Sequence, residues 1–108
     1  MTTYGELQVV NLLSSTDGVE IIQGVAGKRI KIHAMVLSAV TSAANCSMEG
    51  GTGGTGMDTK LGPFPTVATV ALVLPLMPEA WATLDDGDSL WLNVISAGTF
   101  GGQIYYTQ

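Results

Sequence analysis

Charged residues are scarce in this chain of 108 residues: they make up 12% of it, and the net charge is −5. A typical soluble domain carries about twice that charged share. Lysine and arginine together number four, and three of them cluster as Lys28, Arg29 and Lys31. Because binding to DNA or RNA needs more clustered cations than this, we expect no nucleic-acid partner. So few charges also favour a protein that covers part of its surface with neighbouring subunits.

Cysteine and histidine occur once each, as Cys46 and His33. A single cysteine excludes an internal disulfide and fits folding in a reducing cytosol, where we expect Cys46 to be a small buried hydrophobe. Catalysis by histidine usually needs an orienting carboxylate, and zinc needs more ligands than these two residues supply. We therefore expect His33 at a surface or an interface, and we predict neither an enzyme nor a bound cofactor.

Long apolar runs are also lacking. The longest stretch, residues 67–77, is interrupted by Thr69 and Pro75 and is too short to cross a bilayer. The N-terminus has no charged-then-apolar signal pattern. The sequence therefore predicts a soluble protein without a membrane partner.

Glycine, in contrast, is abundant: fourteen glycines accompany many β-branched residues, which is typical of short strands joined by tight turns. This density of strands predicts an all-β fold, a single antiparallel β-sandwich or jelly-roll-like domain over residues 14–108. Residues 1–13 are interpreted as an N-terminal arm or an edge strand, and residues 78–84 as one or two helical turns. The expected strands span residues 6–13, 19–24, 29–40, 45–49, 57–61, 66–74, 89–95 and 103–107.

The strand expected at residues 29–40 is apolar on both faces. Strict alternation puts Ile30, Ile32, Ala34 and Val36 on one side and Arg29, Lys31, His33, Met35 and Leu37 on the other. The strand expected at residues 66–74 repeats this pattern. Because a strand with two apolar faces needs a second covering layer, the pattern favours oligomerisation. The residues predicted to be buried at a subunit interface are Met35, Leu37, Val70, Leu72 and Trp91.

Three glycine-rich or acidic segments superficially match ligand-binding motifs. Residues 51–56 spell G-x-G-x-x-G, but no helix can follow them, so we interpret residues 50–56 as a flexible loop. Residues 24–29 lack the spacing of a phosphate loop and are interpreted as a hairpin turn. Residues 85–88 (Asp-Asp-Gly-Asp) could hold a calcium ion but lack the rest of an EF-hand, so solvated turn acids are favoured.

The aromatic residues Trp81, Trp91 and Tyr105 leave two interpretations open. They could form a platform on which sugar rings stack, or they could belong to the core or to a subunit interface. The position of Trp91 in a partly two-faced apolar segment favours the second interpretation.

Several segments together resemble small β-sandwich virion proteins of tailed bacteriophages, many of which are capsid decoration (cement) proteins. The resemblance covers about residues 19–106, and its motifs are turn and strand signatures. They are Gly24-Val25-Ala26-Gly27-Lys28-Arg29-Ile30, Val36-Leu37-Ser38-Ala39, Gly62-Pro63, Leu72-Val73-Leu74-Pro75, Trp81, Gly87-Asp88-Ser89-Leu90-Trp91-Leu92-Asn93 and Gly101-Gly102-Gln103-Ile104-Tyr105.

The resemblance implies a homotrimer on the outer capsid surface of a virion assembled in the host cytoplasm. There it would bridge neighbouring subunits of the major capsid protein. Lys28, Arg29 and Lys31 are then candidate capsid contacts, and residues 1–13 could add a strand to the sheet of a neighbouring subunit. The alternatives are a trimeric receptor-binding or fibre-tip module and a carbohydrate-binding β-sandwich module.

Overall fold

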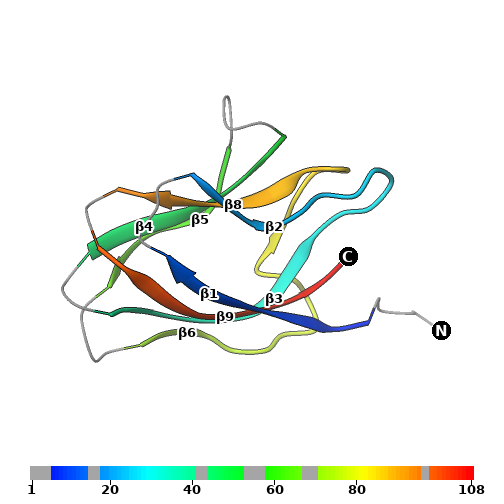
Figure 1. Cartoon of the computed structure of the whole chain (residues 1–108). Helices are drawn as coiled ribbons and strands as arrows, with labels where there is room; N and C mark the ends of the chain where they lie inside the picture. The colour runs from blue at the N-terminus through cyan, green and yellow to red at the C-terminus, as the bar shows by residue number, and fades with distance from the viewer. Residues whose placement is uncertain (1–5, 15–17, 41–43, 53–57, 67–70, 96–97) are drawn as a thin grey trace.

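The structure, a computed structural model, describes residues 6–14, 18–40, 44–52, 58–66, 71–95 and 98–108, and these residues form two antiparallel β-sheets. Sheet A contains strands in the order β1-β9-β3-β6, with β7 also paired to β3, and sheet B has the order β2-β8-β4-β5. Figure 1 shows the two sheets lying one over the other. The strands are β1 (Gln8–Ser14), β2 (Val19–Ile22), β3 (Lys31–Ala39), β4 (Ala44–Gly51), β5 (Asp58–Thr66), β6 (Leu72–Leu74), β7 (Ala82–Thr83), β8 (Ser89–Val94) and β9 (Phe100–Thr107).

The strand order is that of a jelly roll. Apart from the short β7, four strands belong to each sheet, and the chain passes repeatedly between the sheets instead of completing one before the other. The predicted all-β sandwich is therefore confirmed. The expected helical turns at residues 78–84 are wrong, because this segment instead contains β7 and follows the edge of β3. Its backbone N–H groups at Trp81 and Leu84 donate to the carbonyls of Ile32 and Ile30 at 2.7 Å and 2.9 Å.

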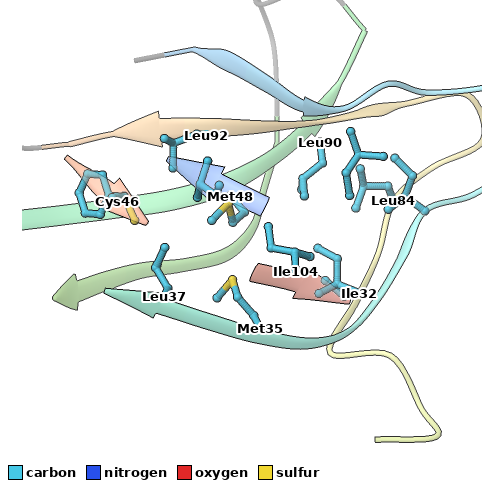
Figure 2. Packing of buried hydrophobic residues seen from close by; sticks show 14 residues of the cluster. Ile32, Met35, Leu37, Cys46, Met48, Leu84, Leu90, Leu92 and Ile104 are labelled. Carbon is cyan, nitrogen blue, oxygen red and sulfur yellow. The ribbon is translucent and has the colours of Figure 1, made fainter. Parts of the chain in front are cut away.

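The core lies between the two sheets and consists of aliphatic, sulfur-containing and aromatic side chains. Figure 2 shows Met35 and Leu37 of β3 together with Cys46, Met48 and Leu92 of sheet B in this cluster. The side chain of Cys46 is fully buried, as expected from the sequence. The other core residues include Leu12, Ile22, Ile30, Ile32, Leu84, Leu90, Phe100 and Ile104.

A β-bulge in β3 changes which side chains face the core. Ile32 pairs with Tyr106 of β9, but Ala34 pairs with Tyr105, so His33 is an extra residue in the ladder. An extra residue reverses the alternation of every side chain after it. Met35 and Leu37 consequently face inward on the same side as Ile32, while Ala34 and Val36 turn outward. β3 is therefore apolar on both faces over residues 34–37, but the predicted assignment of these residues to the two sides is wrong.

The segment expected to be one strand at residues 66–74 is also different. Thr66 ends β5, residues 67–70 lie outside the described residues, and Leu72–Leu74 forms β6. Gly62-Pro63, expected as a turn between strands, lies inside β5, where Gly62 has a φ of 97°. The pairing of β5 with β4 shifts register on both sides of Met48, so this irregular stretch is a bulged edge and not a chain reversal.

The first strand belongs to the sandwich. β1 pairs with β9 along its whole length and lies at the end of sheet A. The sequence predicts an arm or an edge strand at residues 1–13. The part of this segment that the structure describes is an edge strand of its own domain.

Candidate interaction surface

The predicted interface residues that the structure describes do not form one surface. Met35 and Leu37 have no exposed area and belong to the core, so their assignment to a subunit interface is wrong, and the bulge at His33 is the reason. Leu72 pairs with Leu37 and packs, half-buried, against the core. Trp91 lies on sheet B, and Val70 lies outside the described residues.

The outer face of sheet A contains a different surface, which has no charged residue and begins beside Lys31 at the start of β3. Directly paired residues of neighbouring strands share one face of a sheet, so the register defines three rows across the four strands. None of the residues in these rows is charged. The rows are Val9–Tyr105–Ala34, Asn11–Gln103–Val36–Val73 and Leu13–Gly101–Ser38, and we call them the sheet A face.

Four apolar side chains of the sheet A face are open to solvent. The exposed fractions are 52% for Val9, 75% for Leu13, 38% for Val36 and 56% for Val73. Aliphatic side chains exposed in such numbers on one sheet face mark a surface suited to a protein partner. The sequence-based interface set contains none of them, although the alternation of Val9, Asn11 and Leu13 in the first strand was a usable signal.

A chain of hydrogen bonds holds the polar side chains in the middle of this face. The Tyr105 hydroxyl donates to Gln103 Oε1 at 3.0 Å, and Gln103 Nε2 donates to Asn11 Oδ1 at 3.1 Å. At the end of the face, a Cβ added to Gly101 would lie 3.4 Å from Val40 and 3.6 Å from Leu13, so these two side chains flank the glycine. The face is therefore ordered by its own contacts and presents aliphatic groups around a polar centre.

The outer face of sheet B differs in charge. Trp91 is the direct strand partner of both Glu20 and Glu49, and Glu49 also pairs with Thr59. The indole N–H of Trp91 donates to the Gly51 carbonyl at 3.0 Å, which fixes the ring along the sheet. Carboxylates thus flank the aromatic group of sheet B, whereas the sheet A face carries no charge.

The basic cluster and the acidic turn lie next to each other. Lys28, Arg29 and Lys31 are exposed, and the turn before them is closed by a bond from Lys28 N–H to the Val25 carbonyl at 3.0 Å. This turn connects β2 of sheet B to β3 of sheet A, so the hairpin expected at residues 24–29 is a crossing between sheets.

Asp86 links the acidic turn to that crossing. Its Oδ1 accepts from Gly27 N–H at 2.7 Å, while Gly87 N–H donates to the Lys28 carbonyl at 2.9 Å. Gly87, with a φ of 79°, makes the bend expected from the sequence. Among the described residues, no three His, Cys, Asp or Glu side chains gather as a metal site requires. Asp86 acts here as an acceptor for a backbone amide.

His33 is buried, contrary to the surface position expected from strand parity. Its Nδ1 lies 3.1 Å from the Met77 carbonyl oxygen, and its Nε2 lies 3.1 Å from Thr107 Oγ1. Because a carbonyl only accepts, Nδ1 carries the proton and donates to Met77, and in the neutral ring Nε2 accepts from the Thr107 hydroxyl. The bulge residue therefore joins three segments: β3, the end of β9 and the chain after β6.

Cys46 offers no reactive thiol. Burial raises the pKa of its thiol to about 11, so it stays protonated at neutral pH.

The three aromatic residues do not share a surface. Trp81 is 42% exposed, and its indole N–H donates to the Pro75 carbonyl at 2.8 Å. Tyr105 belongs to the sheet A face, and Trp91 belongs to sheet B. The alternative in which Trp81, Trp91 and Tyr105 together form one sugar-stacking platform is therefore wrong. Of the two tryptophans, Trp81 is the more exposed.

Comparison with known proteins adds no relative: no family model, no curated protein and no solved structure matches this chain. The described residues contain no helix with the length and apolar character that a membrane crossing requires.

Proposed function

We propose that this chain is a structural virion protein that binds the outer surface of a phage capsid as an oligomer, with a trimer as the expected state, and cements neighbouring capsomers. Its partners are copies of itself and the major capsid protein. It acts by binding and performs no catalysis.

The observation that carries this proposal is the uncharged sheet A face with its exposed Val9, Leu13, Val36 and Val73. Burial of apolar area stabilises a protein–protein contact without requiring a charge match. Jelly rolls occur in viral capsid proteins and in lectins, so the fold accommodates both the proposal and its carbohydrate-binding alternative. A cement protein needs only modest contacts per subunit, because contacts repeated over a shell reinforce one another.

The exposed basic cluster Lys28, Arg29 and Lys31 supplies a second contact in this proposal. Lys28 and Arg29 lie on the crossing from sheet B to sheet A, and Lys31 begins β3, where it pairs with Thr107 beside the Ala34–Tyr105 row. Cationic side chains at the rim of an apolar contact steer association with an acidic surface, and salt weakens this effect. Capsid attachment is therefore expected to be faster at low ionic strength and to persist in part at high salt.

The test is co-sedimentation of the purified chain with expanded capsids assembled without it. We expect saturable binding that Val36→Asp abolishes, because this substitution puts a charge at the centre of the sheet A face. Thr59→Asp is the matched control, since Thr59 is exposed on sheet B. Absence of binding by the wild-type chain, or equal loss with both variants, would contradict the proposal.

The exposed indole of Trp81 favours one second candidate, a carbohydrate-binding module. Aromatic rings open to solvent stack on the apolar faces of sugars. Glycan binding by the isolated chain that Trp81→Ala removes, without attachment to capsids, would support this candidate over the first.

A further inference from the structure

We propose that the outer edge of β1 is a self-pairing site. Two copies of the chain place their β1 strands side by side, antiparallel, about a twofold axis at Asn11, so that two sheets A become one continuous sheet. This inference does not rest on the proposed function, because it follows from the edge strands and their sequences.

The other sheet edges carry features that obstruct strand addition. β5 contains Pro63 and Pro65 and is interrupted by register shifts, β2 has four residues with Glu20 among them, and β6 and β7 have three and two residues. Proline, charge, bulges and short length are the usual protections of an edge.

β1 has none of these protections. It has seven residues, no proline and no charge, and it pairs with β9 in an unbroken register from Gln8 to Ser14. A long, regular, uncharged edge strand is a template for pairing with another strand. The contrast with the other edges identifies β1 as the place where the sheet is open to extension.

The sequence of β1 identifies the second strand as another copy of β1. Gln-Val-Val-Asn-Leu-Leu-Ser reads as the same pattern of polar and apolar residues in both directions about Asn11. Antiparallel pairing about Asn11 sets Val9 of one copy opposite Leu13 of the other, Val10 opposite Leu12, and Gln8 opposite Ser14. A shift by two residues would instead oppose Val9 to Asn11, so the symmetric register is the one that matches every pair.

In this register the exposed apolar side chains of β1 become covered by the second copy. Val9 and Leu13 point outward from sheet A and are exposed, and a cross-strand contact between them would bury part of both, twice per pair of copies. On the inner side, Val10 and Leu12 already pack with the core, and their counterparts would extend it across the junction. Apolar contacts thus form on both faces of the new strand pair, with Asn11 opposite Asn11 at the axis.

A twofold contact of this kind joins copies in pairs. If trimers form through other surfaces, the β1 contact joins one trimer to the next. The expected solution masses are therefore those of two or six 11.2 kDa chains.

The first experiment measures mass by light scattering coupled to size exclusion for the wild type, Asn11→Lys and Asn11→Glu. Each variant places two like charges directly opposite each other at the axis, so each is expected to halve the wild-type mass. A one-to-one mixture of the two variants is expected to restore that mass, because lysine then faces glutamate. Thr59→Lys on β5, an exposed strand residue of sheet B, is the matched control and is expected to keep the wild-type mass.

The second experiment uses Asn11→Cys under mild oxidation. Directly opposed residues of antiparallel strands have Cα atoms about 4.5–5.5 Å apart, which lies within disulfide range. We expect rapid cross-linking into covalent pairs and little for Thr59→Cys on sheet B, while the buried Cys46 stays unreactive. A wild-type mass of one or three chains, no restoration in the charge mixture, or equal cross-linking of the two cysteine variants would overturn the proposal.

Discussion

Replacement of Leu37 by alanine tests directly whether the end of β3 faces the core or a partner. Leu37 is fully buried on a strand flanked by β9 and β6, where it pairs with Gly102 and Leu72. Because β9 and β6 hold β3 from both sides, its backbone can move little into the cavity that the removed leucine side chain leaves. A buried Leu→Ala change costs about 2–5 kcal/mol, and we expect about 3 kcal/mol here. Val36→Ala, one residue away on the sheet A face, is the matched control and is expected to cost about 0.5 kcal/mol.

Urea unfolding at a fixed protein concentration measures the difference. With a slope of about 1.5–2 kcal/mol per molar urea, Leu37→Ala should lower the midpoint by about 1.5–2 M. The oligomeric mass of the folded variant should match that of the wild type. The reasoning about the bulge would be refuted if Leu37→Ala unfolded at the same urea concentration as Val36→Ala while the oligomer dissociated.

Three further outcomes follow from buried contacts. His33→Leu should destabilise the fold by about 1–3 kcal/mol in urea unfolding, because the buried Thr107 hydroxyl loses its acceptor and the Met77 carbonyl loses a donor. Since the pKa of Cys46 is raised to about 11 when folded, the unfolded thiol ionises first. Stability should therefore fall as the pH rises from about 9 to about 11, and Cys46→Ala should remove that part of the pH dependence. Gly102→Ala should cost about 3 kcal/mol in thermal melts, because its Cβ would collide with a carbonyl of β3, whereas Gly101→Ala should be nearly neutral.

The strands were largely predictable because alternation and turn residues are local signals. β1, β2, β8 and β9 lie within a few residues of the expected segments, and the acidic turn bends at Gly87 as expected. The pairing of strands was not predicted, because it is decided by contacts between segments distant in the chain. Sequence alternation alone could not tell that β1 stays in its own sheet.

The bulge in β3 shows why the predicted interface was wrong. Strict alternation would put Ile32, Ala34 and Val36 on one side, whereas an extra residue brings Met35 and Leu37 to the side of Ile32 and turns Ala34 and Val36 outward. The register of β9 against Ile32 and Ala34 shows that β3 contains this extra residue. His33 itself carries the only local hint, since it is a polar residue that finds buried partners at Met77 and Thr107.

The few charged residues of the strands are distributed unevenly between the two sheets. Charged residues of the strands lie largely on sheet B, with Glu20 and Glu49 beside Trp91, while the three rows of the sheet A face have none. The surface expected to meet a partner is thus the outer face of a sheet, and its exposed aliphatic groups come from β1, β3 and β6.

The β1 contact and the sheet A face have a joint consequence for capsid attachment. The twofold axis that relates two antiparallel strands of one continuous sheet is perpendicular to that sheet. Both copies therefore turn their sheet A faces to the same side. Two copies paired at Asn11 then offer a partner a doubled face, and simultaneous attachment strengthens binding beyond that of one copy. Asn11→Lys should consequently weaken capsid attachment by about tenfold or more. Because this substitution also puts a charge on the sheet A face, the mixture with Asn11→Glu, which keeps charges at this position but restores pairing, isolates the contribution of pairing. Titration of capsids with wild type, Asn11→Lys and the mixture with Asn11→Glu measures this effect. Equal occupancy curves for all three would mean that the face binds as a single copy and that pairing contributes nothing to attachment.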